Sequence, residues 1–305
     1  MIAFLFPGQG SQRAKLLADS ARAFDAHDLF ASASDLLGRN VMDEDDDEAL
    51  RRTEVVQRNV FLAGVAAARA LERNGISARA AAGHSIGAFA AATIAGALPF
   101  ADALKLVELR GRSMARTFGP GYAMGAILGA SEREVEAIVA LPEIAGQAYV
   151  AVINARDQIV IAGTDEAVGR ALELALARGS RNVRTLAVAV PSHTPLMLPV
   201  RNELAAAVAR IDVGPPRIPV AANVDGRALF GPGEVAQDLV ESVMHPVRWL
   251  DATQMLRERG IDCFIEAFLG DTLTGLVESA FPEAIALSLG RTSLSSAVSR
   301  ASRPN

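Results

Sequence analysis

Cysteine is nearly absent from the 305 residues: Cys263 stands alone, so the chain has no internal disulfide. A single thiol in an apolar stretch fits a reducing compartment and favours a buried structural role over a catalytic one. No apolar run is long enough to span a membrane. The apolar run 2–6 is broken at once by Pro7 and Gly8, so it is too short for a signal peptide. We therefore expect a cytoplasmic protein with no membrane contact.

Net positive charge is also missing. The chain has 30 Lys and Arg against 35 Asp and Glu, a formal net charge of −5. This balance argues against a nucleic-acid partner. Half of the residues are hydrophobic, which allows a sizeable core. The length suits one large α/β domain, or one domain that carries an inserted subdomain.

What the chain does contain is a run of the form Gly-x-Ser-x-Gly at residues 83–87. A short apolar segment at 78–82 suits a buried strand, and the alanine-rich segment 88–97 suits a buried helix. This is the context of a nucleophile elbow, which places a serine on a sharp strand-to-helix turn. The pattern alone is weak, because a glycine-flanked serine can simply cap a helix. It makes Ser85 a candidate nucleophile that forms an acyl-enzyme.

The other predicted elements alternate along the chain. The N-terminal third has a strand at 2–6 and helices at 13–30, 59–73 and 101–116. The middle third has strands at 124–128, 149–154, 158–162 and 182–190 and helices at 131–140 and 164–178, the β-α-β-β-α-β order of a ferredoxin-like unit. The C-terminal third has strands at 218–223, 262–267 and 284–288 and helices at 195–211, 234–244, 251–260 and 272–279.

This alternation predicts an α/β fold in which a mostly parallel sheet carries helices on both faces. We expect a large catalytic domain formed by residues 1–119 and 188–305. The ferredoxin-like subdomain is expected as an insertion at residues 120–187.

A serine nucleophile needs a base, and the chain offers His27, His84, His193 and His245. His193 follows a predicted strand end, where α/β folds collect site residues, and comes after the serine as in α/β-hydrolases. It is our candidate base, with a buried core histidine as the alternative. No acid is placed clearly to orient it. Asp225 or Asp271 could serve, or a backbone carbonyl could fix the tautomer.

Five motifs occur together and in order, and they resemble the malonyl-CoA:acyl-carrier-protein transacylase family over nearly the whole chain. They are Phe-Pro-Gly-Gln-Gly-Ser-Gln at 6–12, Gly-His-Ser-Ile-Gly at 83–87, Glu-Leu-Arg-Gly at 108–111, Val-Pro-Ser-His at 190–193 and Pro-Val-Arg-Trp at 246–249. The resemblance implies an α/β-hydrolase-like large domain with a ferredoxin-like insertion. It also implies transfer of malonyl from malonyl-CoA to the thiol of an acyl carrier protein.

The resemblance implies catalytic roles at four matching positions. Ser85 carries the acyl group, and His193 acts as general base and then as general acid. The backbone amides of Gln9 and Ile86 form the oxyanion hole, in keeping with the usual donors around an elbow nucleophile. No bound cofactor or metal is implied, because the coenzyme A thioester is a substrate and the thiol arm of the carrier is the acceptor.

The resemblance also implies residues that bind substrate. Arg110 clamps the free carboxylate of malonyl, where a planar guanidinium gives a paired, charge-assisted grip; a snorkelling surface arginine is the alternative. Gln57 and Asn154 are expected to line the same pocket. The backbone around Arg248 is expected to hold the histidine.

Three segments depart from the common family pattern. Ala88-Phe89 replaces an acidic residue and an aromatic, Arg58-Asn59 follows Gln57 in place of a proline, and residues 268–271 replace a glycine-proline-glycine turn. Residues 83–92 and 269–274 look most like the transacylase (epsilon) subunit of bacterial malonate decarboxylase. We therefore expect the protein to transfer malonyl within the malonate decarboxylase system, with the carrier subunit of that system as its partner. The alternatives are malonyl transfer in fatty acid or polyketide synthesis, and a serine thioesterase or hydrolase on the same elbow.

Overall fold

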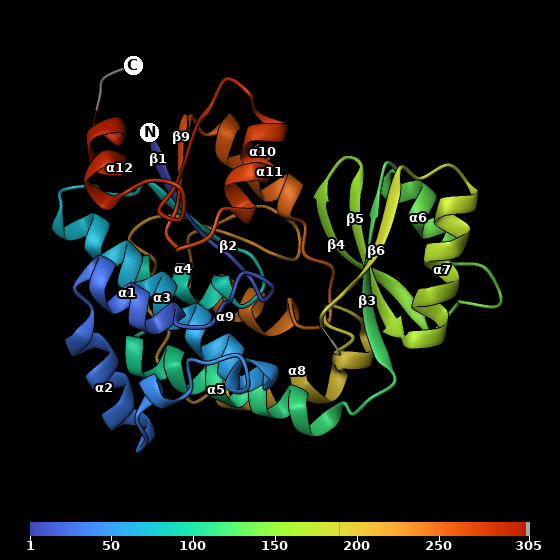
Figure 1. Ribbon diagram of the computed structural model, residues 1–305, viewed down its shortest axis with the longest axis horizontal. Coiled ribbons are helices and arrows are strands. Elements are labelled where there is room, and N and C mark those ends of the chain that lie inside the picture. The colour runs from blue at the N-terminus through green and yellow to red at the C-terminus, as the bar shows by residue number, and fades with distance from the viewer. Residues whose placement is uncertain (189, 303–305) are drawn as a thin grey trace.

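The computed structural model describes residues 1–188 and 190–302. Two units lie next to each other (Figure 1): a larger one from the N- and C-terminal thirds of the chain, and a smaller one from the middle. In the described ranges, no helix is both long and apolar enough to cross a membrane.

The larger unit is built on a six-stranded sheet in the order β10-β9-β1-β2-β7-β8. All neighbours from β10 to β7 are parallel, and β8 runs antiparallel to β7, so the sheet is mixed. The strands are β1 (Ile2–Phe6), β2 (Ala80–Gly83), β7 (Val220–Ala221), β8 (Ala228–Leu229), β9 (Cys263–Glu266) and β10 (Ile285–Ser288).

Both faces of this sheet are buried, as β1 shows. Phe4 and Phe6 pack into one core and Ala3 and Leu5 into another, because successive side chains of a strand point to opposite faces. A parallel strand covered on both sides has no polar alternation. This is why the apolar run at the N-terminus forms a strand.

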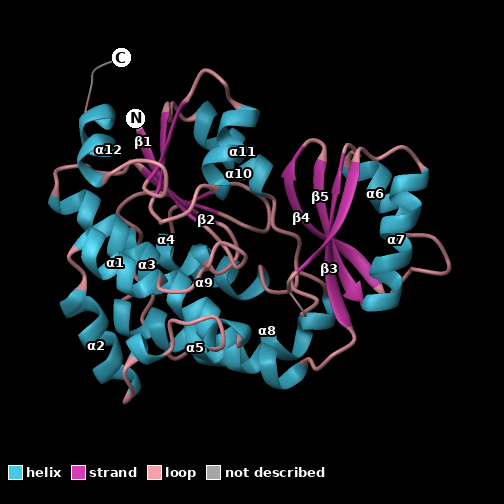
Figure 2. Cartoon of the chain, in the orientation of Figure 1, coloured by secondary structure: helices cyan, strands magenta, loops and turns pink. Residues whose placement is uncertain are grey.

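Helices cover both faces of the large sheet, shown in cyan in Figure 2. They are α1 (Leu16–Phe24), α2 (His27–Leu37), α3 (Thr53–Arg73), α4 (Gly87–Ile94), α5 (Phe100–Thr117), α8 (Leu198–Val208), α9 (Pro232–Glu241), α10 (Trp249–Glu258), α11 (Thr272–Ala280) and α12 (Leu294–Ala301). The alanine-rich α3 is buried nearly all round, against α1, α4 and α5. On the opposite face, α10 and α11 share a core with the smaller unit.

The smaller unit is a four-stranded antiparallel sheet in the order β4-β5-β3-β6. Its strands are β3 (Tyr122–Leu128), β4 (Ala148–Ala155), β5 (Gln158–Thr164) and β6 (Asn182–Leu186). Helices α6 (Glu132–Val139) and α7 (Asp165–Ala177) cover one face (Figure 2). Val160 and Ala162 of β5 point the other way, into the core shared with the larger unit. This face helps to form the cavity described below.

The structure differs from the predicted elements at several places. The helix predicted at 13–30 is two helices, because Asp25 adopts a left-handed conformation (φ 48°) between α1 and α2. The strand predicted at 182–190 ends at Leu186, and residue 189 lies outside the described residues. Strand β8 was not predicted, since two residues carry no periodic signal.

Candidate active site

Ser85 lies on the turn between β2 and α4, so the strand–turn–helix context predicted for residues 78–97 is confirmed. Its φ is 54°, a left-handed conformation that costs a non-glycine residue energy and recurs at functional sites. Gly87 is required by the packing of the turn: a Cβ there would lie 2.1 Å from the carbonyl oxygen of Phe6. The end of β1 therefore holds the turn that exposes the serine.

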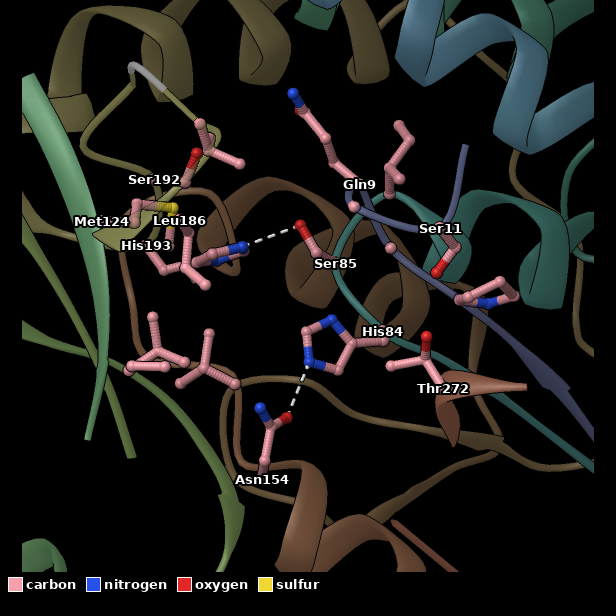
Figure 3. Close-up of a pocket in the computed structure, with 18 of the residues that line it drawn as sticks. Gln9, Ser11, His84, Ser85, Met124, Asn154, Leu186, Ser192, His193 and Thr272 are labelled. Carbon is pink, nitrogen blue, oxygen red and sulfur yellow. Dashed lines mark hydrogen bonds between the residues drawn. The ribbon is translucent and has the colours of Figure 1, made fainter. Parts of the chain in front are cut away.

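His193 faces Ser85, as Figure 3 shows. The distance from Nε2 of His193 to Oγ of Ser85 is 2.7 Å. On the other side of the ring, Nδ1 donates to the carbonyl oxygen of Ser242 at 2.5 Å. Because a carbonyl only accepts, Nδ1 carries the hydrogen and Nε2 is left to accept the proton of the Ser85 hydroxyl.

The environment of His193 keeps its ring neutral. The side chain is buried, and burial lowers its pKa to about 3, with the positive charge of Arg110 lowering it in the same direction. A neutral imidazole is the form that can take a proton from Ser85.

No carboxylate orients the histidine within the described ranges. Asp225 pairs with Arg227, and Asp271 pairs with Arg291. The backbone-carbonyl alternative is confirmed, but the carbonyl is that of Ser242 and not one around Arg248.

The prediction for Arg248 is therefore corrected. Its guanidinium pairs with Glu132 of α6 at 2.9 Å and with Asp251 of α10, and it is not among the residues that line the cavity. The pair with Glu132 ties the larger unit to the smaller one.

Arg110 reaches the serine from α5. Its Nη2 donates to Oγ of Ser85 at 3.1 Å, and its Nη1 donates to Oε1 of Gln57 at 2.6 Å. The side chain is 3% exposed. Burial lowers its pKa to about 10, so the guanidinium remains charged at neutral pH. Among the residues described, no carboxylate lies within ion-pair distance of it, so this buried cation has only neutral partners.

A buried ion network links α3, which carries Gln57, to α5, which carries Arg110. Glu108, 1% exposed, accepts two bonds of 2.8 Å from Arg39, and Nη1 of Arg58 lies 3.6 Å from its carboxylate. Arg58 is fully buried and also bonds Glu44 at 2.5 Å. Arg58, which departs from the family pattern, therefore has ion-pair partners. The network joins α3 to α5 next to Gln57 and Arg110.

A cavity of about 470 Å³ opens between the two units above Ser85. Gln9, Ile86, Arg110 and Asn154 line it, together with Ser85 and His193, so the structure brings six of the eight predicted site residues together. Figure 3 shows the imidazole of His84 directed toward Asn154, with 3.1 Å from its Nε2 to Oδ1. Gln57 is not on the cavity wall; it contacts Arg110 instead.

The backbone amides of Gln9 and Ile86 belong to the two loops beside Ser85. In the described part of the chain, neither N–H donates to a protein acceptor. A Cβ on Gly8 would lie 3.0 Å from the carbonyl oxygen of His84, which shows how closely the first loop approaches the elbow. The arrangement can deprotonate Ser85 and offer it to an acyl group near two free donors.

Besides Ser242, two residues that support the site were not predicted. Asn223 bonds the backbone of the elbow, and Asp238 holds Asn223. Asn223 ends a predicted strand beside β2, so its position at a strand end was a usable signal. Asp238 lies inside a predicted helix, and nothing in the sequence around it indicated a role in the site.

Together with this geometry, the match of residues 3–292 to the acyl transferase domain family shows that the chain belongs to that family. The chain is 36% identical over 284 residues to the malonyl CoA-acyl carrier protein transacylase of Escherichia coli K12, covering 90% of this chain and 91% of the relative.

Two solved structures share the fold closely. That of the malonyl CoA-acyl carrier protein transacylase from Coxiella burnetii has a TM-score of 0.93 at 35% identity, covering 99% of this chain and 98% of the other. A malonyl-transacylase solved in complex with its type II PKS acyl-carrier protein has a TM-score of 0.90 at 34% identity, covering 98% and 99%.

Proposed function

We propose that the protein is a malonyl-CoA:acyl-carrier-protein S-malonyltransferase that works through a malonyl-Ser85 intermediate. The observation that carries this proposal is Arg110, a buried guanidinium with neutral partners, 3.1 Å from Oγ of Ser85. A buried charge is stabilised best by an opposite charge in good hydrogen-bond geometry. The carboxylate at the far end of a malonyl group supplies that charge. The names of the relatives support the same activity.

In the first half of the reaction, Oγ of Ser85 attacks the thioester carbon while Nε2 of His193 takes the hydroxyl proton. The carbonyl oxygen gains negative charge, which the amides of Gln9 and Ile86 bind; one such donor typically contributes about 3 kcal/mol in the transition state. The carbon–sulfur bond then breaks, and coenzyme A leaves as its thiol with the proton from His193. The carrier thiol repeats these steps in reverse on malonyl-Ser85.

The remaining predicted residues act through their neighbours in this proposal. Gln57 orients Arg110 by accepting from its Nη1, and Asn154 bonds Nε2 of His84 beside the nucleophile. Ser242 replaces the backbone around Arg248 as the group that holds His193.

We also propose that the chain is divided into two domains. We infer an α/β-hydrolase-like catalytic domain at 1–119 and 188–305 and an inserted ferredoxin-like subdomain at 120–187. The strand order β4-β5-β3-β6 with two helices on one face supports the second description. The serine elbow at the end of a parallel strand supports the first.

For the biological setting, the comparisons favour the alternative over the main expectation. The relatives are transacylases named for acyl carrier protein, and one was solved with a polyketide carrier, so we propose malonyl transfer in fatty acid or polyketide synthesis. The malonate decarboxylase system is the second candidate, on the strength of residues 83–92 and 269–274 alone.

Loading with radiolabelled malonyl-CoA tests the function. We expect label on the wild-type protein and on the Ser295→Ala control, an exposed serine of α12, and none on Ser85→Ala. Label retained on Ser85→Ala would remove Ser85 from the mechanism.

Two carriers offered in parallel, one with ordinary phosphopantetheine and one with the dephospho-coenzyme A arm of malonate decarboxylase, decide the setting. Faster transfer to the first is expected. Coenzyme A release at the same rate with and without either carrier would indicate a hydrolase.

The pH dependence of Ser85 reactivity is expected to be flat in the neutral range. Only the neutral form of His193 acts as a base, and its pKa of about 3 keeps that form dominant down to acid pH. A histidine with an unshifted pKa of about 6.5 would be half protonated at about pH 6.5, and the rate at that pH would be half of its maximum. The measurement is the rate of Ser85 modification by an uncharged fluorophosphonate between about pH 8 and pH 6.5. A halved rate at the lower limit would contradict the prediction.

A further inference from the structure

The side chain of Asn223 bonds both sides of the turn that carries Ser85. Its Oδ1 accepts the backbone N–H of Ser85 at 2.9 Å, and its Nδ2 donates to the carbonyl of Gly83 at 2.9 Å. Asn223 follows β7, the neighbour of β2 in the sheet, and is 2% exposed. One side-chain amide therefore extends the β2–β7 pairing into the elbow, beyond the last backbone pair.

Asn223 is itself held by a carboxylate on α9. The two oxygens of Asp238 accept the backbone N–H of Asn223 at 2.9 and 3.1 Å, and Oδ1 also accepts the N–H of Val224 at 3.0 Å. Asp238 is 7% exposed, so these bonds are shielded from water. The carboxylate of Asp238 thus accepts from two adjacent backbone N–H groups, which anchors the segment that carries Asn223.

The same helix ends beside His193. Helix α9 ends at Glu241, and the carbonyl of Ser242 accepts from Nδ1 of His193. The next carbonyl, of Val243, accepts the backbone N–H of His193 at 2.9 Å. Helix α9 and the residues that directly follow it thus bond the elbow through Asn223 and the histidine through two carbonyls.

Both reacting residues need such support. Ser85 has φ 54° and His193 has φ 65°, two of the few left-handed non-glycine residues in the described chain. A residue in this conformation persists only where its surroundings hold it firmly. Among the described residues, no backbone hydrogen bond joins the segment of Ser85 to that of His193. A third element that bonds both segments would fix the Ser85–His193 distance.

We propose that α9 is that element, and that Asp238 and Asn223 are positioning residues that hold Ser85 at bonding distance from His193. Neither residue lines the cavity, so neither contacts substrate. The inference rests on the proposed function in one respect, that Ser85 is the nucleophile. A displacement of about 1 Å in such a site costs on the order of 100-fold in rate.

The test measures the reactivity of Ser85 with an uncharged fluorophosphonate, alongside malonyl loading and the melting temperature. Asn223→Ala is expected to lower the fluorophosphonate rate by about 100-fold. Asp238→Asn keeps one oxygen where Oδ1 accepts from Asn223 and Val224, so its rate is expected to fall between those of Asp238→Ala and the wild type. This graded rescue by the conservative variant would not follow from a purely structural role.

Val235→Ala is the matched control, because Val235 is buried on α9 one turn before Asp238 and makes no side-chain hydrogen bond. It is expected to lower the melting temperature and to leave the fluorophosphonate rate unchanged. If the alanine variants fail to fold, Asp238→Asn decides: a reduced rate supports the proposal, and a wild-type rate overturns it.

Wild-type rates in Asn223→Ala and Asp238→Ala would also overturn it. Failure of the proposed function looks different: the wild-type protein would then react with the fluorophosphonate but take no malonyl.

Discussion

His193→Ala is expected to slow the acylation of Ser85 by malonyl-CoA by about 10⁴-fold or more, the scale of losses on removing a member of a serine–histidine system. Nε2 of His193 lies 2.7 Å from Oγ of Ser85, and no other group in the described chain is placed to accept that proton. Arg110 also contacts this oxygen but only donates. Without the imidazole, Ser85 attacks as a weakly nucleophilic alcohol. Single-turnover measurement of labelled malonyl-Ser85 gives the rate directly.

His27→Ala is the control for this variant, because His27 is exposed at the start of α2 and its loss removes an imidazole without touching the site. Its acylation rate should equal that of the wild type. Added imidazole should partly restore His193→Ala, since the removed ring leaves room for a free base. A loss smaller than ten-fold would indicate that another residue is the base.

The catalytic pair could be predicted from the sequence because each residue lies in a motif, and these motifs, weak one by one, occur together and in order. Ser85 follows a short apolar strand and precedes a small-residue helix, with glycines where the turn passes close to β1. His193 follows Pro191 in the segment beyond the end of β6 at Leu186. At such positions the type of turn is set by residues close in sequence, so local pattern and tertiary structure agree.

The residues that support the pair could not be predicted in the same way. Asp238 bonds residues 14 and 15 positions earlier in the chain, and Asn223 bonds residues 138 and 140 positions earlier. Nothing in a helix pattern marks one aspartate as buried, since its partners are backbone groups brought in by the sheet order. The sequence shows that Arg58 departs from the family pattern but does not indicate its partner, because Glu108 lies on another helix.

The secondary structure could likewise be predicted only in part from the sequence. The β-α-β-β-α-β order of the middle third was predicted, since its elements are of ordinary length and both helices begin at clear capping residues. The break between α1 and α2 was missed because Asp25, unlike glycine or proline, gives little sign that it will adopt a left-handed conformation. The position of Arg248 was misplaced because its ion partner Glu132 belongs to the other unit.

Arg110→Ala is expected to reduce malonyl loading of Ser85 by about 30-fold to several thousand-fold, while acetyl loading falls little. Truncating one partner of a buried, hydrogen-bonded charge pair costs about 2–5 kcal/mol, and each 1.4 kcal/mol is a factor of ten. In the wild type, acetyl leaves the guanidinium with the neutral partners Gln57 and Ser85, so little is lost with that acyl group when Arg110 is removed. Arg110→Lys keeps the charge but not the two-pronged geometry, and should lie between them.

Arg112→Ala provides the comparison, because Arg112 is on the same helix but exposed. It should leave the ratio of malonyl to acetyl loading unchanged when coenzyme A thioesters are compared without a carrier. Equal losses for both acyl groups in Arg110→Ala would mean that the arginine only supports the fold or the serine. The ratio is the informative quantity, because a general weakening of the Ser85–His193 pair lowers both rates alike. Only the loss of a cation that binds the distal carboxylate changes the preference between two acyl groups of nearly the same size at the reacting carbon.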